Sequence, residues 1–389
     1  MKRKDIVGLN NSIKFISTNA LKELKNYIPF RDEQWKYTNI NQFDKYNFNT
    51  LSSYSDFKTS NNKLNIISLK DAFNNNTNNC QNIFNQIIPK DKNKFILYNT
   101  AYFKSGNYFY LSKESTQKKP IYIDNIINEN KSNSFINSRL LFHFGKNSSA
   151  TIVLNELNNS NALANIVYEL YLEENSNIEL IINSNKPQTS QILNLGSTIK
   201  KNACLKIFPI DISGKLIKNN YFVNLNEPNS QFYYNGLNLL NDNNYTDNYI
   251  EVNHNTKYTI SDINQKNILS DKSKGIFYSK SIIKNNSSNS EAHQKNNNII
   301  LSENSMVHSN PQLMIYNDDV KCSHGSTTGK IDDEALFYLR SRGININTAK
   351  QLLLSAFLND IIDNIINEDI NLSIKEKINL WINKHANKK

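Results

Sequence analysis

The chain has 389 residues, of which 38% are hydrophobic and 21% are charged, and its formal net charge is +10 at pH 7. This length and composition suffice for a sizeable core and for two or three domains. No apolar run approaches the roughly 18 residues that a membrane-spanning helix needs. The basic start, MKRKDIVGLN, lacks the apolar segment of a signal peptide. We therefore predict a cytoplasmic protein with no membrane span. The lysines are scattered among acidic residues, so the positive charge does not indicate nucleic-acid binding.

Residues 1–95 are predicted to form an N-terminal region that is helical at first and mixed afterwards. Its first helix has an apolar face and ends before Pro29. The residues of that face are Ile13, Ile16, Leu21, Leu24 and Ile28. The Asn-rich tract over residues 74–82 is low in complexity and predicts a loop.

Residues 96–325 are predicted to be all-β, because short apolar runs alternate with Asn, Ser and Asp turns. Among these runs are Phe95–Leu97, Ile121–Ile123, Ile152–Leu154, Ile166–Leu172, Ile178–Ile182 and Leu205–Ile210. Hairpins usually need glycine at tight turns, and the chain has only ten glycines. Asparagine tolerates the left-handed conformation and can stack in ladders, which suits a solenoid of stacked coils. The spacing alone leaves a β-helix, a sandwich and a barrel open.

Residues 326–389 are predicted to form a C-terminal helical domain. Asp332 or Asp333 can cap its first helix. An apolar stripe follows at helical spacing through Ala349, Leu352, Leu353, Ala356, Phe357, Ile361, Ile362, Ile365 and Ile366. A last short helix is marked by Ile374, Ile378, Trp381 and Ile382. A solenoid needs caps at its ends, and the flanking helical segments can supply them. The stripe is broad enough to bind a partner as well.

The best chemical lead is a predicted turn, Cys322-Ser323-His324-Gly325, between the last strand and the first C-terminal helix. On extended backbone residues i and i+2 share a face, so the thiol and the imidazole can converge on one ion. Two ligands leave a transition-metal site half filled, so either a second chain completes it or nothing binds. The alternatives are a buried, apolar role for Cys322 and a hydrogen-bonded core position for His324.

The other reactive residues suggest no further site. Cys80, Cys204 and Cys322 are far apart, which disfavours a disulfide framework, an autonomous zinc site and a local cluster motif. His254 and His293 are interpreted as structural. No phosphate-binding loop occurs, so ATP hydrolysis is not assigned to this chain.

The stretch around Cys322 resembles the C-terminal signature of the SufD branch of the SufB/SufD family, in the SUF iron–sulfur cluster assembly system. The matching segments are Pro311-Gln312-Leu313, Asp318–Gly325, Phe337-Tyr338-Leu339 and Ser341-Arg342-Gly343. A second match covers Glu33 and Trp35–Thr38, and a weaker one covers His254, Ser261, Lys266, Gly275, Ala292 and Gln294. The SufB branch typically carries a His-Glu-Ala turn and more cysteines, so the Cys-Ser-His-Gly turn favours SufD.

The resemblance implies a right-handed parallel β-helix flanked by helical regions, acting as a non-catalytic scaffold. It implies pairing with a SufB-like paralogue through the β-helix, and binding of a SufC-like ATPase by the C-terminal helices. It also places His324, with Cys322 as a second candidate, at the SufB interface as a ligand of the nascent iron–sulfur cluster. The small number of ligands predicts, separately, no stable cluster on the isolated chain. The family complex is associated with reduced flavin, but no flavin motif is found in this sequence.

Two other functions remain open from the sequence. One is a carbohydrate-active β-helix enzyme, such as a polysaccharide lyase or hydrolase, which needs acidic or basic residues grouped along a groove. The other is a β-rich binding module without metal chemistry. Neither an acidic groove nor an export signal is visible in the sequence.

Overall fold

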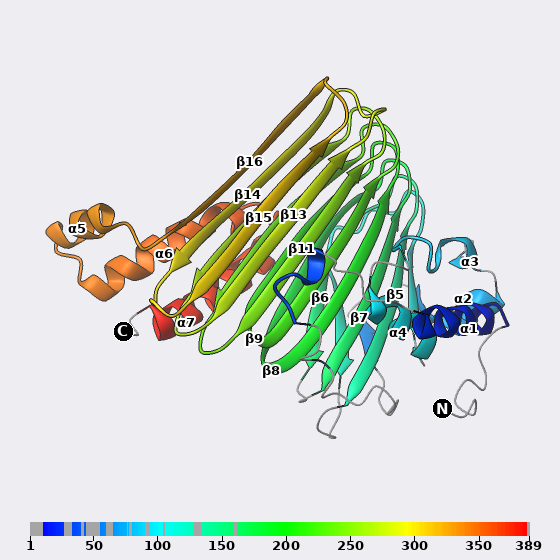
Figure 1. Ribbon diagram of the computed structural model, residues 1–389, viewed down its shortest axis with the longest axis horizontal. Helices are drawn as coiled ribbons and strands as arrows, with labels where there is room; N and C mark the ends of the chain where they lie inside the picture. The colour runs from blue at the N-terminus through cyan, green and yellow to red at the C-terminus, as the bar shows by residue number, and fades with distance from the viewer. Residues whose placement is uncertain are drawn as a thin grey trace.

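The computed structural model describes residues 11–26, 33–39, 43, 55–59, 65–75, 77, 80–89, 93–103, 106–127, 134–158 and 162–386. Figure 1 shows a stack of long strands with helices at both ends of the chain. The N-terminal elements are α1 (Asn11–Lys25), η2 (Glu33–Trp35), β1 (Ser55–Thr59), β2 (Asn65–Ser68), α2 (Leu69–Asn74), α3 (Cys80–Ile83) and α4 (Lys94–Tyr102). The C-terminal helices are α5 (Asp333–Ser341), α6 (Ile346–Ile362) and α7 (Glu368–His385).

The central strands form a parallel β-helix with two sheets, here called face A and face B. Face A contains β3 (Asn107–Leu111), β5 (Phe135–Phe144), β7 (Leu163–Leu172), β11 (Tyr245–His254), β13 (Lys274–Ile283) and β15 (Met306–Ile315). Face B contains β4 (Ile121–Ile127), β6 (Ser149–Asn158), β10 (Gln231–Leu240), β12 (Ile260–Leu269), β14 (Ser290–Ile300) and β16 (Val320–Gly329). The long strands β8 (Asn177–Ile199) and β9 (Cys204–Leu225) run through both faces. The predicted parallel β-helix is confirmed.

Asparagine forms many of the turns, as the sequence predicts. Asn147, Asn175, Asn202 and Asn229 occupy equivalent turns of successive coils, and each has a positive φ between 54° and 61°. Their side chains form a ladder, with Nδ2 of one residue donating to Oδ1 of the preceding one at 2.8 to 3.0 Å. Because asparagine adopts this conformation at little cost, the coils turn without glycine.

The two faces enclose one apolar lumen. Alternate residues of each strand point inward, among them Leu140, Ile166, Leu195, Val223 and Ile250, and all are buried. The other residues of each strand point outward and meet the terminal regions. The N-terminal elements pack on the outer side of face A, where Ile88 and Ile96 contact Val167. Helices α6 and α7 pack on the outer side of face B.

This packing corrects the prediction that the helical segments cap the ends of the solenoid. Helices α4, α6 and α7 lie on its faces instead. At the N-terminal end, β1 and β2 pair antiparallel with β4 and β3. None of the helices that the structure describes combines the length and the apolar character needed to cross a membrane.

Several local predictions were also wrong. The segment Phe95–Leu97 is not a strand but part of α4, where the side chain of Asn93 caps the helix. The tract over residues 74–82 is not wholly a loop, because α3 starts at Cys80. The predicted face of the first helix extends to Ile28, which lies outside the described residues, and α1 ends at Lys25.

The C-terminal stripe was only partly right. Leu352 and Ile366 are 48% and 73% exposed, whereas Leu354 and Leu358 are buried against face B. The last helix, α7, is longer than predicted, and its four marked residues, Ile374, Ile378, Trp381 and Ile382, are all buried.

Candidate ligand site on the terminal coil

The predicted turn over Cys322–Gly325 is in fact part of strand β16, the last strand of face B. The segment is extended because its backbone pairs in register with β14, and Ala292 lies opposite Cys322. Among the described strands, β16 pairs only with β14, and β15 pairs only with β13. The last coil therefore has free strand edges on both faces, and Figure 1 shows both strands at the end of the stack.

Cys322 and His324 lie on the inward side of β16. Their partners across β14 are Ala292 and Gln294, which are buried at 0% and 3% exposure and belong to the inward-facing row of that strand. No further described coil covers this row, so Cys322 is half-buried and His324 is exposed. The thiol and the imidazole thus share a face, as the i and i+2 spacing predicts for extended backbone.

The floor beneath His324 is polar and fully hydrogen-bonded. Oε1 of Gln294 accepts a hydrogen bond from Ser279 at 2.7 Å, and Nε2 donates to the Ser281 hydroxyl at 2.7 Å and to the Gln312 carbonyl at 3.0 Å. These three hydrogen bonds satisfy the side-chain amide of Gln294, which therefore does not hold the His324 imidazole in place. On the same inward side, Ser326 Oγ donates to Ser309 Oγ at 2.8 Å and links β16 to β15.

The terminal coil holds two candidate ligands, Cys322 and His324, but no third one beside them among the described residues. No three His, Cys, Asp or Glu side chains within the described ranges are grouped closely enough to hold a metal ion. Burial raises the pKa of the Cys322 thiol, an effect partly offset by a hydrogen bond from the backbone of Ala292. A thiol with a raised pKa stays protonated at neutral pH until a metal displaces the proton.

The thiols of the other two cysteines, Cys80 and Cys204, are also protonated and unreactive at neutral pH. Burial raises the pKa values of Cys80 and Cys204 to about 11. Neither lies on the last coil, since Cys80 is in α3 and Cys204 begins β9. The structure does not bring the three thiols together at one cluster position.

His254 has the structural position that the sequence predicts. It is buried at 0% exposure, with Nδ1 2.7 Å from the Thr259 hydroxyl and Nε2 2.8 Å from the Ser261 hydroxyl. Burial lowers its pKa from 6.5 to about 3. His293 lies on the outer side of face B, where Nδ1 is 2.8 Å from the Ser323 hydroxyl.

We expect His254 to make the protein sensitive to acid. Its folded pKa of about 3 lies below the unfolded value of 6.5, so the unfolded chain binds the proton first. The stabilisation by the neutral imidazole is present above pH 6.5 and is lost as the pH falls towards 3, by about 1.4 kcal/mol per unit at most. Urea unfolding between pH 4 and pH 7 should show this slope, and His254→Gln should flatten it. An unchanged slope in the variant would disprove the assignment.

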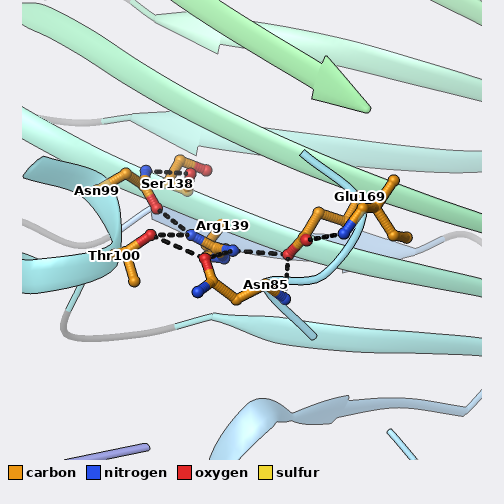
Figure 2. Close-up of polar contacts among 7 residues, drawn as sticks. Asn85, Asn99, Thr100, Ser138, Arg139 and Glu169 are labelled. Carbon is orange, nitrogen blue, oxygen red and sulfur yellow. Dashed lines mark hydrogen bonds and ion pairs between the residues drawn. The ribbon is translucent and has the colours of Figure 1, made fainter. Parts of the chain in front are cut away.

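A buried ion-pair network lies on the outer side of face A, where sequence reasoning predicted no site, and Figure 2 shows it. Arg139 Nη2 lies 2.6 Å from Glu169 Oε2, and both side chains are 1% exposed. Nη1 of Arg139 donates to Thr100 Oγ1 at 2.9 Å, and the backbone N–H of Asn85 donates to Glu169 at 3.0 Å. The partners are up to 84 residues apart, so no local motif marks them.

The comparisons with known proteins agree with this geometry. The profile described as "SUF system FeS cluster assembly, SufBD core domain" matches residues 126–357, which is more than half of the chain. The chain belongs to the SufBD family. The matched segment contains most of the β-helix and the whole of β16.

Curated relatives of the family match parts of the chain. The iron–sulfur cluster assembly protein SufD of Escherichia coli is 36% identical over 157 residues, which are 40% of this chain and 37% of that protein. A SufBD family protein of Synechocystis is 29% identical over 202 residues, 52% of this chain and 45% of that protein. SufD of Plasmodium berghei is 24% identical over 257 residues, 65% of this chain and 19% of that protein. These matches span less than half the length of each relative and give no support to a carbohydrate-active enzyme.

Proposed function

We propose that this chain is a SufD-type scaffold subunit of a SufBCD-type complex that assembles iron–sulfur clusters and passes them to apo-proteins. The observation that carries the proposal is the unfinished last coil of a SufBD-family β-helix, with Cys322 and His324 side by side at its open end. The scaffold supplies geometry and ligands, and ATP hydrolysis belongs to a partner.

The SufB-like partner docks at the last coil. Free edges of β15 and β16 present unpaired backbone N–H and C=O groups, which a strand of another chain can pair with. Iron–sulfur clusters usually need four thiolates or equivalent ligands. A second β-helix apposed here brings the ligands that this chain lacks, so the nascent cluster is cargo held between two subunits.

His324 is the stronger of the two candidate ligands. Its imidazole is exposed, and within the described residues its side chain makes no hydrogen bond that would compete with a metal. Cys322 is half-buried and its thiol pKa is raised, so it binds a metal only with loss of a proton. His324 therefore makes the first contact with iron, and Cys322 contributes once metal is present.

The SufC-like ATPase binds at α5. This helix has no buried residue, although its sequence includes Phe337 and Tyr338, which are 73% and 57% exposed. Leu352 of α6 is 48% exposed as well, and Figure 1 shows α5 standing apart from the strands. Large exposed aromatic side chains on a helix that the chain itself does not cover are suited to a protein partner.

We expect the paired change Phe337→Ala and Tyr338→Ala to weaken ATPase binding by about a hundredfold or more, because exposed aromatic anchors typically dominate such interfaces. Stability should hardly change, since neither side chain is buried. Binding of the purified ATPase by calorimetry, with Leu372→Ala on the exposed side of α7 as control, tests this. Equal affinity of the paired variant and the control would argue against α5 as the docking helix.

The proposed function is tested by reconstitution with its partners. The isolated chain, given iron and sulfide without oxygen, should retain little of either, because it holds two ligands. The same chain assembled with the SufB-like and SufC-like proteins of its own organism should retain both in fixed proportion. A long-lived, stoichiometric cluster on the isolated chain, or no complex at all, would refute the proposal.

A further inference from the structure

The outer sides of faces A and B differ sharply in chemistry where the terminal regions cover them. Helices α6 and α7 lie on a continuous apolar surface of face B. The face B residues in that contact are Val153, Ile181, Phe208, Ile210, Ile212, Leu237, Leu239 and Ile268. Described residues 33–39, 80–89 and 93–103, here called the N-terminal cover, lie on face A, where apolar contacts are split among three separate clusters.

Between these clusters, two ion pairs of face A are buried under the N-terminal cover. In the first, Arg139 pairs with Glu169, and the cover adds Thr100 and Asn85 as partners (Figure 2). The ring of Phe84, also in the cover, lies 4.4 Å from the guanidinium. Every member of this network that comes from face A is almost fully desolvated.

The second ion pair lies three coils further along. Lys218 Nζ is 2.8 Å from Asp247 Oδ1, with side-chain exposures of 0% and 3%. The N-terminal cover again lies over the ion pair, because the Trp35 ring lies 5.5 Å from Lys218 Nζ and the Thr38 hydroxyl donates to Asp247.

Asparagines continue this polar surface. Asn165 Nδ2 donates to Asn137 Oδ1 on the neighbouring strand and to the Phe95 carbonyl of the cover. Asn93 of the cover donates to Asn194. Several buried polar atoms here have no hydrogen-bond partner in the described part of the chain, namely Trp35 Nε1, Asn137 Nδ2, Arg139 Nε, Asn165 Oδ1, Asn194 Nδ2 and Asn220 Oδ1.

Such a contact is easier to open than an apolar one. Burial of charged and unsatisfied polar groups carries a desolvation penalty, which water repays as soon as the cover lifts. Lifting α6 and α7 from face B exposes mainly apolar side chains, with Lys266 and Asn241 among the few polar groups released, so hydration favours that opening much less. We propose that the N-terminal cover is a reversibly docked unit that opens from face A while the β-helix and the C-terminal helices stay folded.

Opening of the cover would remove a contact that supports the last coil. The Tyr37 ring of the cover stacks on His308 of β15, with ring centroids 4.7 Å apart. The next residue, Ser309, forms the hydrogen bond to Ser326 on the inward side of β16. The docked cover therefore braces the strand that forms one wall of the terminal coil.

Native-state hydrogen exchange of the full-length chain tests this inference. Amides of α4 should exchange about tenfold or more faster than those of β9 and of α6, because sub-global openings have lower free energies than global unfolding. Exchange of α4, β9 and α6 at one common rate would mean that they open together, and it would overturn the proposal.

The variant Glu169→Gln sharpens the test, because it neutralises one partner of a buried pair. It should accelerate exchange in α4 by about a hundredfold and leave β9 and α6 unchanged. The control is Asp262→Asn, which turns an exposed carboxylate on the outer side of face B into an amide and should alter none of the three. Acceleration throughout the chain, or no acceleration in α4, contradicts a separable cover.

If Glu169→Gln does not give folded protein, Thr38→Val offers the same test at the second ion pair. It removes the hydroxyl that donates to Asp247 and keeps the size and shape of the side chain. Exchange in α4 and around Trp35 should then rise by about tenfold, with β9 unchanged. No local rise would overturn the proposal.

Discussion

The change His324→Ala is expected to leave the subunit folded and its complex assembled, while the iron and sulfide content of that complex falls by about tenfold or more. The imidazole is exposed at the open end of the lumen, so its removal creates no cavity. The stability of the subunit should therefore change by no more than about 0.5 kcal/mol. Loss of cluster without loss of fold is the signature of a ligand at an interface.

The matched control is His293→Ala, one strand away on β14. His293 points to the outer side of face B and contacts Ser323 instead of the inward row. Thermal unfolding of both variants, with iron and sulfide analysis of their purified complexes, separates the two roles. A stable His324→Ala complex that loads iron normally would eliminate the ligand role of His324.

The sequence predicted that the side chains of Cys322 and His324 lie on the same face of the backbone, but it did not predict that the segment is a strand. Polar and small residues over Cys322–Gly329 are typical of a turn. They form a strand because β14 offers a parallel edge to pair with, which is a tertiary contact that no local propensity records. On an extended backbone, the two-residue spacing of Cys322 and His324 places both side chains on the same face of β16.

The Asn-rich turns favoured a solenoid for a physical reason, whereas the choice of a β-helix over a sandwich or a barrel came from the family resemblance. Four successive coils turn at an asparagine in the same left-handed conformation, and Asn175 and Asn202 are examples. The helix α4 was not predicted, because Phe95–Leu97 is a short, continuous apolar run. The spacing of apolar residues in such a run cannot distinguish a buried helix from a buried strand. The ion pairs of face A were not predicted either, since Arg139 and Glu169 meet only when adjacent coils stack.

The C-terminal stripe shows how packing overrides a sequence pattern. An apolar run such as Leu352–Leu354 fits more than one helix face. The structure buries Leu354 and Leu358 on face B and leaves Leu352 exposed. The sequence correctly indicated an apolar helix, but the face that meets the sheet is set by the rows of apolar side chains on β9 and β10.

Deletion of residues 344–389, which removes α6 and α7, is expected to destabilise the whole β-helix. It would expose the eight apolar face B side chains that these helices cover. At about 1.5 kcal/mol or more for each, the loss is on the order of 10 kcal/mol, comparable to the entire stability of a typical domain. It would also remove Asp360 of α6, which pairs with Lys266 of face B.

The truncated chain should therefore be recovered mainly as aggregate, and any soluble fraction should bind a hydrophobic dye and unfold at a much lower temperature. The paired change Phe337→Ala and Tyr338→Ala is the control, because α5 buries none of its residues and its loss of aromatic surface leaves face B covered. A soluble truncated chain with the unfolding temperature of the full chain would show that α6 and α7 are only an appended partner-binding unit. The apolar contact with face B predicts instead that these helices stabilise the β-helix, so partner binding in this region has to be tested by changes on α5 and not by truncation.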